Sequence, residues 1–190
     1  MTLITRNRRV ALIALVVVMA EVFGFSSITV FPTFTRDVLD SDAAGLGALG
    51  TARNIGAIAV LLLLARVGLG QSRGGRAIVL AMSALGLGLT AFALSSSFAL
   101  SFAILVVVGG AMAGSDTLSQ ALLQRNVDDA ERGSAAGIWF FAIGFGPLGL
   151  VGLGAAANAV GAPTALAVSG VLLALFAVGL SRVRAIHELV

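Results

Sequence analysis

The sequence contains no cysteine, no lysine and a single histidine, and only 11% of its 190 residues are charged. Without cysteine, the chain has no disulfide framework, thiolate metal site or cysteine nucleophile. His187, close to the C-terminus, does not by itself provide the ligand set of a transition-metal centre, so no metal or other cofactor is expected. An ordinary soluble domain has about 25% charged residues, so this chain cannot build a water-facing surface.

Apolar residues are in excess instead: 58% of the chain is hydrophobic, and the mean hydropathy is +1.06. These residues form long blocks, and a block of about 18 or more is long enough to cross a bilayer as a helix. The predicted fold class is therefore an all-α polytopic membrane protein with one transmembrane domain over residues 1–190. Six spanning helices are predicted, the first closed by Pro32, at about residues 10–31, 43–65, 77–94, 98–123, 135–160 and 164–180.

Arginine supplies all 12 basic side chains, and its distribution predicts the orientation of the chain. The net charge of +3 and pI near 11.3 would also suit a nucleic-acid-binding protein, but the arginines lie in short loops between apolar blocks, so no nucleic-acid partner is expected. Because cytoplasmic loops carry the excess of positive charge, both chain ends are predicted to be cytoplasmic, in a multi-pass protein of the bacterial plasma (inner) membrane. Only Arg36 flanks the opposite helix ends, against ten arginines on the predicted cytoplasmic side: Arg6, Arg8, Arg9, Arg66, Arg73, Arg76, Arg125, Arg132, Arg182 and Arg184.

Glycine is frequent, with 24 residues, and much of it lies within the predicted helices. Closely spaced glycines let helix backbones approach each other inside a membrane, where no hydrophobic force drives helices together. We therefore expect close helix packing at Gly45, Gly47 and Gly50, and at Gly86 and Gly88.

Three ionisable residues lie inside the apolar blocks: Glu21, Arg53 and Asp116. A charge at the bilayer centre costs about 2.5–3.5 kcal/mol on insertion scales, so such residues face the interior of the bundle or a water-filled cavity. There, acid and guanidinium can neutralise each other. Asn54 adjoins Arg53, and Gln120 shares a helix face with Asp116 because the two are four residues apart.

These five polar residues are the predicted pathway for a substrate and protons. In this hypothesis Glu21 or Asp116 loads and releases a proton, and Arg53 tunes the proton affinity of that carboxylate. The alternative is a buried ion pair that only fixes the register of the helices.

The loops on the arginine-rich side have a different chemistry. The segment Gly68–Arg76 is rich in glycine and arginine but lacks the Gly-Lys-Ser/Thr ending of a nucleotide-binding loop. It could pair with Asp128, Asp129 or Glu131 of the next loop in one conformation and separate in another. An ordinary positive anchor on the cytoplasmic side is an equal alternative.

The same loop resembles the Gly-x-x-x-Asp-Arg-x-Gly-Arg signature of the major facilitator superfamily, as repeated between its eighth and ninth helices. Gly68, Arg73, Gly75 and Arg76 match, and Ser72 replaces the usual Asp.

Two further segments support the resemblance. Residues 126–134 are similar to the Val-Pro-x-x-x-Arg-Gly stretch between helices ten and eleven of drug and siderophore exporters, with Asp128 in place of the proline. Gly146 and Pro147 lie in a segment similar to the Gly-Pro helix bend of exporter-type members, whose best-known copy is in helix five.

The resemblance covers nearly the whole chain and implies the second half of a twelve-helix secondary transporter, built from 3+3 inverted repeats and working by alternating access. Glu21, Arg53 and Asp116 would then lie on helices seven, eight and ten, which line the cavity in many members. The implied function is proton-coupled efflux of a small amphipathic compound. The implied gating residues on the cytoplasmic side are Gly68, Arg73, Gly75, Arg76, Asp128, Glu131, Arg132 and Gly133.

A half-transporter needs a second wall for its cavity. We expect that the chain is a fragment of a protein with six more helices before it, or that it pairs with another six-helix chain or with a second copy of itself, and we favour the fragment. An intramembrane enzyme is disfavoured, because Ser115 has no histidine within the membrane and Asp128 and Asp129 are adjacent rather than spaced along a helix face. A non-transporting six-helix membrane subunit is the remaining alternative.

Overall fold

A computed structural model describes residues 2–67, 74–187 and 189. All regular structure in these ranges is helical, which confirms the predicted all-α class. Six helical stretches are long and apolar enough to cross a membrane: Arg8–Asp37, Ala43–Val67, Gly74–Ala93, Phe98–Arg125, Asp129–Val160 and Ala162–Ser181.

The first of these spans changes its helical type three times. Its α-helix ends at Met19, and the chain continues through a π-helical turn and a 3₁₀ segment. The predicted end at Pro32 is not where the helix stops, because Pro32 occupies the first turn of a new α-helix, where its missing N–H is not needed. The segments are α2 (Arg8–Met19), η1 (Ala20–Gly24), η2 (Phe25–Val30) and α3 (Phe31–Asp37), preceded by the short α1 (Thr2–Arg6).

The middle spans α4 (Ala43–Val67), α5 (Gly74–Ala93) and α6 (Phe98–Arg125) are continuous helices. The fifth span is broken into two helices, α7 (Arg132–Ile143) and α8 (Gly146–Val160). Gly161 separates the last two spans and has φ +86°, a conformation that favours glycine. The remaining elements are η3 (Asp129–Glu131), α9 (Ala162–Ser181) and α10 (Arg184–His187).

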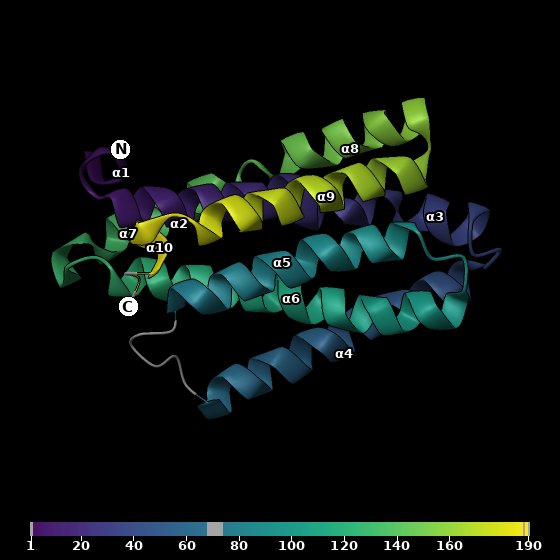
Figure 1. The fold of residues 1–190 in the computed structure, drawn as a ribbon, viewed down its shortest axis with the longest axis horizontal. Coiled ribbons are helices and arrows are strands. Elements are labelled where there is room, and N and C mark those ends of the chain that lie inside the picture. The colour runs from purple at the N-terminus through teal and green to yellow at the C-terminus, as the bar shows by residue number, and fades with distance from the viewer. Residues whose placement is uncertain (1, 68–73, 188, 190) are drawn as a thin grey trace.

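The spans pack as two inverted groups of three. The second span of the first group, α4, lies along the first span of the second group, α6 (Figure 1). In the same way α8, in the second span of the second group, packs on η1 and η2 of the first span, and the two third spans, α5 and α9, pack on each other. This reciprocal pattern is the 3+3 inverted-repeat arrangement that the resemblance implies.

Glycines lie where the closest helix pairs cross. A side chain at Gly56 of α4 would overlap the carbonyl of Val106 on α6, and a Cβ at Gly86 of α5 would lie 2.8 Å from the carbonyl oxygen of Gly170 on α9. The packing predicted for Gly86 is therefore confirmed. The packing predicted for Gly47 and Gly50 is wrong, because a Cβ at either position would meet no atom within 4 Å; these glycines lie on the outer face of α4.

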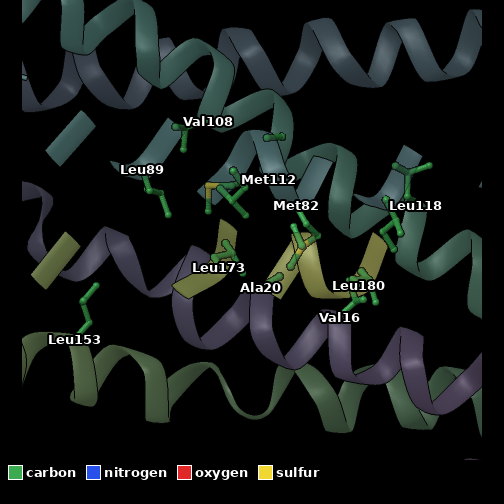
Figure 2. Close-up of a cluster of buried hydrophobic side chains, with 14 of the residues drawn as sticks. Val16, Ala20, Met82, Leu89, Val108, Met112, Leu118, Leu153, Leu173 and Leu180 are labelled. Atoms are coloured by element: carbon green, nitrogen blue, oxygen red, sulfur yellow. The ribbon is translucent and has the colours of Figure 1, made fainter. Parts of the chain in front are cut away.

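The core between the spans is apolar. Ala20, Met82, Met112 and Leu173 come from four different spans and belong to one cluster of buried side chains (Figure 2). Large apolar side chains also cover the outside of the bundle, as they do in a protein surrounded by lipid.

The two chain ends lie at the same end of the bundle. α1 and α10 are found there, together with the last turn of α4 and the start of α7 (Figure 1). Nine of the ten arginines assigned to one side by the sequence are thereby gathered at this end, called here the arginine-rich end. The tenth, Arg73, lies outside the described residues.

Candidate functional site

Glu21 lies in the π-helical turn η1, near the middle of the first span. A π turn releases backbone carbonyls from the regular helical pattern, and in lipid each of them needs another partner. Ser26 donates a hydrogen bond to the carbonyl of Val22 (2.6 Å), and Ser169, from the distant helix α9, donates one to the carbonyl of Phe23 (2.7 Å). The turn is thus held both from within its own span and from the last span.

The break in the fifth span lies directly against this turn. α7 ends at Ile143 and α8 begins at Gly146, which with Pro147 forms the segment where the sequence predicts a bend. A Cβ added to Gly146 would lie 3.0 Å from Oε2 of Glu21. The carboxylate therefore rests against the first turn of α8, where the helix dipole is positive and favours a negative charge.

Asp116, on α6, is the second acid of the site. Its side chain is half-buried, as is that of Glu21, and the two carboxyl groups are close enough to interact electrostatically. Like charges at this distance repel each other in the bundle interior, and the repulsion is relieved when one carboxyl group takes up a proton. Both acids are therefore candidates to carry a proton inside the bundle.

Arg53 pairs with neither acid. Its Nη2 donates a long hydrogen bond to Sδ of Met112 (3.5 Å), and its guanidinium carbon lies 5.2 Å from the ring centroid of Phe31, in a cation–π contact. Its Nε is buried without a hydrogen-bond partner among the described residues. The expected neutralisation of acid by guanidinium is therefore absent from the described part of the chain, and Arg53 keeps a free donor inside the bundle.

Arg53 nevertheless belongs to the same region as the acids. Met112, its hydrogen-bond partner, lies one helical turn before Asp116 on α6. The backbone of Arg53 packs on Gly109, where any side chain would overlap it. The crossing of α4 and α6 thus fixes the backbone from which the guanidinium extends.

The other predicted pathway residues lie outside this interior cluster. Asn54 and Gln120 are exposed on the outer faces of α4 and α6. Ser115 and Ser119 are buried, and each donates its hydroxyl hydrogen to a carbonyl of its own helix. The structure therefore half-buries Glu21, Asp116 and Arg53, with Arg53 against Met112 and Phe31, and leaves Asn54 and Gln120 on an open surface.

The predicted gating loops are only partly described. Gly68 and Arg73 lie outside the described residues, while Gly75 is buried and Arg76 exposed at the start of α5. Arg132 pairs with Asp129 of its own segment (2.8 Å).

Within the described residues, the possible pairing between the two loops does not form through Arg76. In the parts of the chain that are described, Arg76 forms no ion pair with Asp128 or Glu131. A Cβ at Gly133 would meet no atom within 4 Å, so this glycine lies in open space.

Three residues of the site were not predicted. Ser169 is a lone hydroxyl in the sixth apolar block, 146 positions from its acceptor Phe23, and nothing in the sequence connects the two. Phe31 and Met112, which surround Arg53, are indistinguishable in the sequence from other apolar core residues.

A family model described as Major Facilitator Superfamily matches residues 9–187, which include all six spans except the first residue of the first. A search of curated proteins found no match.

Proposed function

Because the chain belongs to the major facilitator superfamily, we propose that it is the second six-helix half of a secondary transporter that exchanges protons for a small amphipathic compound leaving the cell. Members of this family are multi-pass membrane transport proteins that work by alternating access. The observation that carries proton coupling is the Glu21 carboxylate, which has no basic partner among the described residues and lies in a π-helical turn against a helix break.

The protonation state of Glu21 would bias the contact between the first and fifth spans. When ionised, Glu21 is attracted to the positive end of α8 and repelled by Asp116. When protonated, it loses both interactions. Since α7 and α8 are separate helices and η1 is not regular α-helix, each span has a point at which its two parts can move independently. Proton binding would thereby change the packing of the two spans.

Arg53 is the candidate to bind an electronegative group of the exported compound. It has a buried, unused Nε donor and an aromatic neighbour in Phe31. A cation beside an aromatic ring, with two carboxyl groups nearby, suits a compound that has both an apolar ring and a polar group.

A second six-helix unit would complete the cavity. The outer face of α4 presents Gly47, Thr51 and Asn54 on successive turns, and Gln120 is exposed on the neighbouring α6. Polar side chains within a spanning segment are costly against lipid. We propose that this face is covered by another six-helix half or by a second copy of the chain, and that the arginine-rich end is cytoplasmic, in a bacterial plasma membrane.

The test is transport of ethidium by everted membrane vesicles that contain the protein together with the six-helix unit that completes its cavity, with an imposed pH gradient. The wild type should accumulate ethidium and dissipate the gradient when ethidium is added. Glu21→Gln and Asp116→Asn should each lose the coupled proton movement. Asp40→Asn is the matched control, because Asp40 is exposed at the opposite end of the bundle from α1 and α10 and asparagine accepts its positive φ of 47°.

Two results would count against the proposal. Proton-coupled transport that persists unchanged in both acid variants would exclude Glu21 and Asp116 as the coupling groups. Vesicles that contain both six-helix units, correctly inserted, and move neither ethidium nor other amphipathic dyes would favour a non-transporting membrane subunit.

A further inference from the structure

A hollow of about 640 Å³ lies at the arginine-rich end of the bundle, away from the Glu21 region. It is formed where the N-terminal segment, the α6–α7 connection and the C-terminal segment meet. The charged residues that line it are Arg6, Arg8, Arg9, Arg184, Asp128 and Glu131.

The walls of the hollow are held in place by specific contacts. The Asn7 side chain accepts hydrogen bonds from the backbone N–H groups of Arg9 (3.0 Å) and Val10 (3.4 Å), and so caps α2. The same side chain donates a hydrogen bond to the carbonyl of Asn126 (3.0 Å) at the end of α6. On the other wall, Ile186 anchors α10, since its side chain is fully buried. The arginines therefore come from separate segments that are fixed to one another.

The charge of the lining favours an anion. Four arginines face two acids, which leaves an excess of two positive charges. Arg6, Arg8 and Arg184 are exposed, and none of them forms an ion pair with another described residue. The planar guanidinium group presents paired donors whose spacing matches the oxygens of a phosphate.

The position of the hollow indicates where such a phosphate would come from. α2 begins at Arg8, and its buried apolar residues begin at Val10. The arginines therefore lie just outside the apolar part of the first span, at the depth of lipid headgroups. We propose that the hollow binds the phosphate groups of an anionic phospholipid, and that a headgroup with two phosphates, as in cardiolipin, matches its two excess charges.

The proposal does not depend on what the protein transports or in which direction. It is tested with purified protein in neutral detergent, by native mass spectrometry with cardiolipin and with phosphatidylcholine. The wild type should retain cardiolipin in preference to phosphatidylcholine. Each basic residue near a membrane surface strengthens the binding of anionic lipid about fivefold, so Arg6→Gln/Arg184→Gln should weaken cardiolipin binding about 30-fold.

Arg66→Gln/Arg182→Gln is the matched control, because it removes two exposed arginines from the same end of the bundle that do not line the hollow. It should bind cardiolipin as the wild type does. Equal weakening in both double variants would overturn the proposal, since it would mean that the net charge of this end and not the hollow attracts the lipid.

Two further measurements do not require the first variant to fold. Asp128→Asn/Glu131→Gln removes the acids of the hollow and should tighten cardiolipin binding several-fold; unchanged affinity would overturn the proposal. Pyrophosphate supplies two phosphate groups without a lipid tail. If it displaces cardiolipin at comparable concentration, the site binds a free anion, and the assignment to a lipid is wrong.

Discussion

Replacing Gly149 by alanine tests whether α8 must touch the π-helical turn of the first span. A Cβ at this position would lie 2.7 Å from both Cα and the carbonyl oxygen of Val22. These are backbone atoms and cannot rotate away. Ordinary van der Waals contact begins at about 3.4 Å, so α8 would have to move by about 0.7 Å. Overpacking of this kind costs about 1–3 kcal/mol.

The variant is expected to have a lower melting temperature in detergent micelles. Its unfolding is monitored by the fluorescence of Trp139, the single tryptophan. In a chain of this size each kcal/mol shifts the melting temperature by about 2–4 °C, so a central loss of about 2 kcal/mol corresponds to about 4–8 °C. Gly152→Ala is the control, because a Cβ there meets no atom within 4 Å and alanine favours the helix. Identical melting of the two variants would refute the close approach of α8 to η1.

Three further substitutions test individual contacts by the same melting assay. Ser169→Ala leaves the carbonyl of Phe23 without its hydrogen-bond donor and should lower the free energy of unfolding by about 1–2 kcal/mol. Ser96→Ala, at an exposed position, is the control and should have no effect. Equal losses in both variants would contradict a stabilising role for this hydrogen bond. Arg53→Met removes the buried Nε donor, which has no partner among the described residues, and should leave the free energy of unfolding unchanged or higher. A loss of about 3–5 kcal/mol would instead reveal an ion pair between Arg53 and one of the acids. Gly161→Ala places a side chain at φ +86° and should lower the free energy of unfolding by about 1–2 kcal/mol. A variant as stable as the wild type would show that the backbone of this turn can adopt another conformation without loss.

The candidate site illustrates how far intramembrane charges can be interpreted from sequence. The cost of a charge in lipid predicted that Glu21, Arg53 and Asp116 face the bundle interior, and the structure half-buries all three side chains. The same argument predicted that acid and guanidinium neutralise each other, and here it was wrong. Arg53 contacts Phe31 and Met112 instead, because the crossing at Gly109 sets the direction in which its side chain leaves α4.

The sequence by itself determined the fold class and the six spans. In lipid each backbone polar group must be satisfied within its own segment, so a long apolar block has almost no alternative to a helix. Arginine counting also placed both chain ends at one end of the bundle, because each block that crosses the membrane reverses the side of the next loop.

Only the tertiary structure decided which face of each helix is buried. The apolar residues of α4 are spread around the whole helix, so its sequence does not distinguish Gly47 and Gly50, which face outward, from Gly56, which lies against α6. The π-helical turn likewise depends on Ser169 and Gly149, which are far away in the chain. In lipid no hydrophobic force separates inside from outside, and close steric fit and hydrogen bonds between distant residues make that choice.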